Sequence, residues 1–117
     1  MFEFLSRIFC TGTDRFDRRF AQALQKGLRL MAPEAVRALR GEVASAQADN
    51  GLFRGRGGDG DLYYTFFALP IARMVRAEID RTACRRAVAS VRLEALDAVH
   101  AVAAIRLRRM LRLTKQE

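Results

Sequence analysis

Apolar residues recur every three or four positions along most of the chain, which is the spacing of one face of an α-helix. This pattern predicts a first helix from Asp14 to about Leu30 and a second from Pro33 to about Gln47. A proline fits the first turn of a helix, because the first backbone N–H groups have no partner there. Apolar and polar residues seldom alternate as they do in strands, so the pattern predicts an all-α protein.

Three further helices are predicted after a glycine-rich loop at residues 49–61. The third begins at Asp61, whose carboxylate can accept backbone N–H bonds as a helix cap, and Pro70 should kink or end this helix. Beyond Asp80 the chain has neither glycine nor proline. The apolar spacing there predicts a short fourth helix, a break within residues 90–94 and a long fifth helix.

Length, composition and charge fit one packed domain spanning residues 1–117. Half of the residues are hydrophobic, which argues against disorder. The net charge of +8 should attract phosphate, nucleic acid or anionic lipid. An arginine excess of this kind more often reflects genome composition than a specific partner, so nucleic-acid binding is an alternative that is not favoured.

The sequence indicates a cytoplasmic protein. No window reaches 18 uninterrupted apolar residues, so no transmembrane segment is expected. The apolar start, with Phe2, Phe4 and Phe9, is interrupted by charges and does not resemble a signal peptide, which leaves open whether it contacts membrane or a partner. Cys10 and Cys84 have neither the spacing of a zinc site nor that of a redox pair.

The segment Gly51–Leu69, GLFRGRGGDGDLYYTFFAL, resembles the repeat signature of protein prenyltransferase β subunits and squalene-type (terpene) cyclases. In that signature a glycine-rich loop precedes an aspartate that opens an aromatic helix. The resemblance implies α/α helical-hairpin repeats, arranged in the related enzymes as an α/α toroid around an apolar cavity for an isoprenoid chain. Because 117 residues are too few for a closed toroid, we expect a partial toroid-like stack of about five helices. Such an open stack should form a homo-oligomer or pair with a second repeat-containing subunit.

The same resemblance argues against a complete zinc site. Prenyltransferases of this type bind zinc through Asp-x-Cys-Tyr and Asp-x-Tyr-His-Thr motifs. Here Asp61 matches the aspartate, but Tyr63 stands at the cysteine position and Tyr64 at the histidine position. Neutral phenols are poor zinc ligands, so no cofactor is expected. The acidic Asp-x-Asp-Asp motif of the cyclases is also missing, and the catalytic residues stay unknown.

Two groups of residues are candidates for ligand contacts. The expected apolar groove consists of Leu62, Tyr63, Phe66 and Phe67. The expected diphosphate contacts are Arg54 and Arg56. The aromatic cluster would equally suit an ordinary core, and the two arginines could be ordinary surface residues. Asp97 and His100 are spaced to share a helical face, but a packed or solvated histidine is the favoured interpretation.

These observations predict a prenyltransferase-like repeat protein that is a noncatalytic or partner-dependent module with an apolar groove. One alternative is a subunit of an isoprenoid-handling transferase or cyclase, in which a partner chain supplies the missing catalytic groups. The other is an arginine-rich helical nucleic-acid-binding protein.

Overall fold

The computed structural model describes residues 15–113. Over this range the chain folds into α-helices and one short 3₁₀ turn, and the range contains no β-strand. The elements are, in chain order, α2 (Arg15–Leu30), α3 (Pro33–Ser45), α4 (Leu62–Val75), α5 (Arg81–Ser90), η1 (Leu93–Ala95) and α6 (Ala98–Met110). The predicted all-α class is confirmed, whereas Phe2, Phe4, Phe9 and Cys10 lie outside the described residues.

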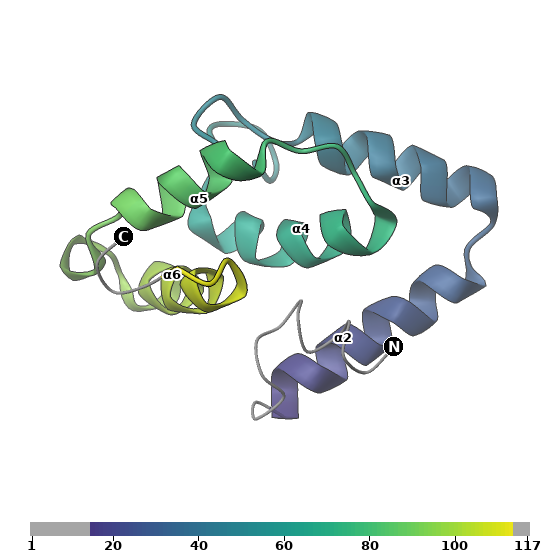
Figure 1. The fold of residues 1–117 in the computed structure, drawn as a ribbon, viewed down its shortest axis with the longest axis horizontal. Helices are drawn as coiled ribbons and strands as arrows, with labels where there is room; N and C mark the ends of the chain where they lie inside the picture. The colour runs from purple at the N-terminus through teal and green to yellow at the C-terminus, as the bar shows by residue number, and fades with distance from the viewer. Residues whose placement is uncertain (1–14, 114–117) are drawn as a thin grey trace.

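Helix α4 lies at the centre of the fold and contacts α2, α3 and α6 (Figure 1). Its contact with α6 is the most extensive. The larger group of buried side chains lies between α4, α5 and α6 and includes Leu62, Phe66, Leu69, Cys84, Val88, Ala104, Leu107 and Met110. A second group joins α3 to α4 through Val43, Phe53 and Ala72. The central helix is therefore covered from several directions, as its nearly continuous apolar sequence requires.

Helix α4 begins as predicted and continues further than predicted. Asp61 caps it by accepting the backbone N–H of Tyr64 at 2.8 Å. Pro70 lies inside the helix, where a proline costs roughly 3 kcal/mol, yet the helix runs on to Val75. The helix continues because Leu69 and Val75 expose only 1% and 2% of their surface, and burying each contributes about 1.5–3 kcal/mol. Of the two predicted outcomes, an end at Pro70 is wrong.

Phe53 is the centre of the glycine-rich loop. Its side chain is fully buried between α3 and α4. Its backbone N–H donates to the Thr65 hydroxyl at 2.8 Å, and its carbonyl accepts the Asp61 N–H at 3.0 Å. The Thr65 hydroxyl in turn donates to the Asp61 carbonyl at 2.6 Å. These bonds satisfy the buried polar groups and fix the loop against the start of α4.

Gln47 fastens the same loop to the start of α5. Its side-chain amide donates to the carbonyls of Gly51 at 3.0 Å and Asp80 at 2.9 Å, and its Oε1 accepts the Asp80 N–H at 2.8 Å. Gly51 has φ +90°, and a Cβ there would collide with the carbonyl oxygen of Ala83. Glycine is therefore required where the loop meets α5.

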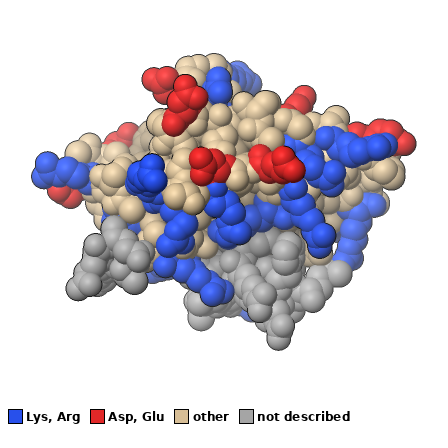
Figure 2. All heavy atoms as spheres, turned by 45° about the horizontal axis from the view of Figure 1, so that its top comes forward, with Lys and Arg blue, Asp and Glu red and all other residues tan. Residues whose placement is uncertain are grey.

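The last two helices are separated by a break at residues 91–97, which begins within the predicted range of residues 90–94 and extends beyond it. Helix α5 is capped by Asp80 and ends at Ser90, and α6 is capped by Asp97, which accepts the His100 N–H at 2.9 Å. No helix within residues 15–113 has the length and apolar character needed to cross a membrane. Basic side chains spread in a band across the face shown in Figure 2, with fewer acidic side chains between and above them.

Candidate functional site

An open groove of about 410 Å³ runs between the N-terminal parts of α4 and α6. Its lining residues are Tyr63, Phe66 and Phe67 from α4, and Ala98, Val99, Val102, Ala103 and Arg106 from α6. Val99 and Val102 expose 57% and 52% of their surface although they are apolar. An apolar surface of this kind, left open beside a packed core, is typical of a site that receives another apolar group.

The wall of the groove on α4 is a chain of aromatic rings in edge-to-face contact. The ring centroids of Phe66 and Phe67 are 5.1 Å apart, and those of Tyr63 and Phe67 are 5.2 Å apart. Phe20 of α2 packs on Phe67 from another direction, with centroids 5.9 Å apart. Such edge-to-face pairs stabilise the arrangement of the rings that form this wall.

One cation lies in the groove. The guanidinium carbon of Arg106 is 6.0 Å from the centroid of the Phe66 ring, within the range of a cation–π interaction. The other seven lining residues carry no formal charge. The groove therefore favours an apolar ligand and places a single positive charge beside it.

The structure places most of the predicted groove residues together. Tyr63, Phe66 and Phe67 line the groove, whereas Leu62 is 4% exposed and packs in the main core. The half of the groove on α6 was missed by the sequence analysis. The signal in the sequence was the spacing of Val99, Val102 and Ile105, which recur every three residues. The structure shows that all three are exposed.

Arg54 and Arg56 lie elsewhere. Both are exposed in the glycine-rich loop, and neither lines the groove. The guanidinium of Arg54 donates to the carbonyl of Gln47 at 3.3 Å, back toward the end of α3. The two expected diphosphate contacts are therefore not part of the groove lining, although Gly55 between them packs against the Tyr64 ring at the start of α4.

Asp97 and His100 are close together at the start of α6. The His100 Nδ1 lies 2.9 and 3.0 Å from the two Asp97 carboxylate oxygens. The backbone N–H of His100, and then its ring, hold the pKa of the Asp97 carboxyl below its usual range. The carboxylate therefore caps a helix, and the arrangement agrees with the structural interpretation of this histidine.

Metal binding and thiol chemistry would depend on the possible metal ligands and the single cysteine of the described range, Cys84. Residues 15–113 contain no group of three or more His, Cys, Asp or Glu side chains that could hold a metal ion. Cys84 is a free thiol, fully buried, and burial raises its pKa to about 11 while the nearby Arg73 acts in the opposite direction. A thiol with such a pKa is protonated at neutral pH and is a poor nucleophile.

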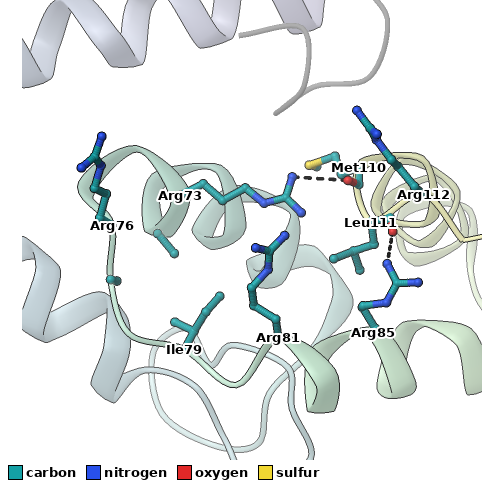
Figure 3. A pocket seen from close by; sticks show the side chains of 10 residues that line it. Arg73, Arg76, Ile79, Arg81, Arg85, Met110, Leu111 and Arg112 are labelled. Atoms are coloured by element: carbon teal, nitrogen blue, oxygen red, sulfur yellow. Dashed lines mark hydrogen bonds between the residues drawn. The ribbon is translucent and has the colours of Figure 1, made fainter. Parts of the chain in front are cut away.

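A second cavity, of about 730 Å³, lies at the C-terminal ends of α4 and α6 (Figure 3). We call it the arginine pocket; it is lined by Arg73, Arg76, Arg81, Arg85 and Arg112 together with Ala72, Ala77, Ile79, Met110 and Leu111. Sequence reasoning did not predict it. The only local signals are the spacing of Arg73 and Arg76 at the end of an apolar helix and that of Arg81 and Arg85 in the next.

Comparisons of this chain with protein-family models, with curated proteins and with solved structures gave no match. The resemblance of Gly51–Leu69 to the prenyltransferase and cyclase repeat therefore stays a prediction.

Proposed function

We propose that the protein is a noncatalytic or partner-dependent binding module whose groove between α4 and α6 receives an apolar chain of isoprenoid type. The observation that carries this proposal is the open groove, in which Val99 and Val102 stay exposed opposite a wall of aromatic rings. Exposed aliphatic residues of this kind lower the free energy of any complex that removes them from water.

Two features support an extended, branched hydrocarbon as the ligand. The groove has the volume of an ordinary small-ligand site, and its polar content is confined to the Tyr63 hydroxyl and Arg106. The isoprenoid class comes from the likeness of Gly51–Leu69 to prenyltransferase and cyclase repeats, in which the same stretch contributes to hairpins around an isoprenoid cavity.

A partner chain is the alternative occupant of this surface. Val99, Val102 and Ile105 form an exposed apolar strip along α6, which suits a homo-oligomer or a second repeat-containing subunit. A cytoplasmic location is part of the proposal, since the cysteine in the described range, Cys84, is a free thiol.

The test is titration of the full chain with farnesol, followed by calorimetry and by native mass spectrometry. Farnesol carries no charge, so its binding reports on the groove and not on the basic surface. We expect a one-to-one complex that Val102→Asp weakens by at least about tenfold, because the ligand would bury a carboxylate.

Ile105→Asp is the matched control. Both residues are exposed aliphatic positions on α6, but only Val102 lines the groove. Ile105→Asp should leave farnesol binding within about twofold of the wild type. If the wild type is a dimer that does not bind farnesol and both variants are monomers, the groove is an interface with a partner chain and not a ligand site. Equal loss of farnesol binding in both variants would also contradict a ligand site in the groove.

A further inference from the structure

The arginine pocket concentrates positive charge from three helices. Arg73 and Arg76 come from the end of α4, Arg81 and Arg85 from α5, and Arg112 from just beyond α6. No acidic side chain is among its ten lining residues. Figure 3 shows the guanidinium groups of Arg73 and Arg81 next to one another near the centre, while the side chains of Arg76 and Arg112 lie at the margins and point away from this pair.

These arginines repel one another. Burial lowers the pKa of Arg73, and the charges of Arg81, Arg112 and Arg85 lower it further. Like charges that face a shared, partly desolvated space destabilise the folded state unless an anion enters it. The pocket thus has an electrostatic requirement that its own lining does not meet.

Helix capping explains only two of the five arginines. Arg73 donates to the carbonyl of Met110 at 3.3 Å, and Arg85 donates to the carbonyl of Leu111. Cations near the last carbonyls of a helix stabilise it, so both have a structural role at the end of α6. Even so, the Arg73 Nε is buried without a hydrogen-bond partner among the described residues. The pocket itself does not complete the bonding of this guanidinium.

Each of the other three arginines occupies a position that carries a backbone or electrostatic cost. Arg76 and Arg112 have φ of 57° and 55°, and no other non-glycine residue in the described range has a positive φ. Glycine or asparagine adopts that conformation at lower cost. Arg81 opens α5, where the positive end of the helix dipole disfavours a cation. The helix dipole favours the charges of Arg76 and Arg112 at the C-terminal ends of α4 and α6, whereas it does not favour Arg81 at the start of α5.

We propose that the arginine pocket binds the di- or triphosphate group of a small organic molecule. Guanidinium forks match phosphate oxygens in geometry and charge, and guanidinium loses less hydration energy on binding than ammonium does. A single phosphate dianion would balance only two of the charges of Arg73, Arg76, Arg81 and Arg112, whereas a triphosphate carries about four negative charges. Ala77 and Ile79 are half-buried and offer an apolar surface to the organic part of the ligand, whereas Met110 and Leu111 are buried beneath the pocket.

The experiment is calorimetric titration of the full chain with orthophosphate, pyrophosphate and tripolyphosphate at constant ionic strength. We expect one site whose affinity rises in that order. Adding a nucleoside triphosphate separates the sources of the phosphate, because a gain over tripolyphosphate assigns the site to an organic ester and no gain assigns it to inorganic polyphosphate. An absence of one-to-one binding by any of these would overturn the proposal.

Two double variants with the same loss of charge test the location of the site. Arg81→Gln with Arg112→Gln changes two exposed pocket arginines and should weaken tripolyphosphate binding by at least about tenfold. Arg19→Gln with Arg37→Gln changes two exposed arginines outside the pocket and should have less than about a twofold effect. Equal losses would mean unspecific attraction to a basic surface and would refute the site.

Arg76→Gly separates binding from folding. Glycine relieves the positive φ, so this variant should melt at the same or a higher temperature while binding tripolyphosphate more weakly. A single-stranded RNA that binds the wild type and is not displaced by tripolyphosphate would point to nucleic acid instead and would contradict the proposal. None of these outcomes depends on the apolar groove. The pocket variants should bind farnesol as the wild type does, so each of the two proposals can be refuted without the other.

Discussion

The apolar groove and the arginine pocket are built on the same pair of helices but have opposite chemistry. The groove lies at the N-terminal parts of α4 and α6 and has one arginine among its eight lining residues. The arginine pocket lies at their C-terminal ends and has five among ten. The negative ends of the helix dipoles favour basic residues at the second location, but they do not require so many. A single helix pair can therefore carry two independent sites, provided that charge is segregated along its length.

The largest expected effect comes from damaging the scaffold that both sites share. Leu107 of α6 is fully buried against α4 and α5, and Leu107→Ala should lower the free energy of unfolding by about 3 kcal/mol. Urea unfolding followed by circular dichroism measures this, with Leu30→Ala as the control because Leu30 is 81% exposed. Farnesol and tripolyphosphate binding should both weaken, and a loss confined to one ligand would show that the sites do not share their support.

Salt should separate the two sites. Raising the NaCl concentration from about 50 mM to about 500 mM should weaken tripolyphosphate binding by about tenfold, because screening acts on the charges of the arginine pocket. Farnesol binding should change by less than about twofold, since apolar burial is not screened. Calorimetry at both salt concentrations measures the two affinities. Equal changes in the affinities for farnesol and tripolyphosphate would show that the two sites do not differ in chemistry.

Removing a helix cap should cause a smaller, local change beside either the groove or the arginine pocket. Asp61 caps α4 beside the groove, and Asp80 caps α5 beside the arginine pocket. Asp61→Ala should cost about 1 kcal/mol of stability and weaken farnesol binding more than tripolyphosphate binding. Asp80→Ala should disturb the arginine pocket more than the groove. The loss of a negative charge beside the pocket should partly offset the resulting loss of tripolyphosphate binding. Thermal melts with both ligands measure these differences.

The smallest expected effect is a pH dependence at the groove end of α6. The pKa of the Asp97 carboxyl lies below its ordinary value of 3.8, so its stabilising contribution is complete at neutral pH and is lost as the pH falls through and below that value. Asp97→Asn keeps a capping oxygen but removes the charge. The stability difference between the wild type and this variant should shrink toward acid pH, as measured by urea unfolding, and a constant difference would exclude Asp97 as the cause.

The sequence predicted those features that depend on neighbouring residues. Apolar spacing located all five described helices, and the cap at Asp61 could be predicted because its partner is three residues away. The α4 side of the groove was expected from the resemblance to prenyltransferase repeats, and three of the four expected residues, Tyr63, Phe66 and Phe67, line it. The course of the chain through Pro70 was not, because burial of Leu69 and Val75 by other helices decides it.

The arginine pocket could not be predicted in this way. Its arginines come from the end of α4, the start of α5 and the residues after α6, and only packing brings them to one cavity. In the sequence they are indistinguishable from the many other arginines of the chain. Likewise, the exposed loop position of Arg54 and Arg56 follows from how Gln47 and Phe53 fix the loop, which involves contacts across more than ten residues.

The contact between Phe20 and Phe67 gives α2 a part in the groove that its position does not suggest. In the described structure α2 touches α4 at few points, and Phe20, Ala21 and Leu24 pack with Met74 in a small cluster of their own. We expect α2, which meets α4 through this small cluster, to open locally more readily than the central helices. Each opening withdraws one support of the Phe67 ring, so amide protons of α2 should exchange more slowly once the groove is filled. Hydrogen exchange of α2 would then report occupancy of a site that this helix does not line.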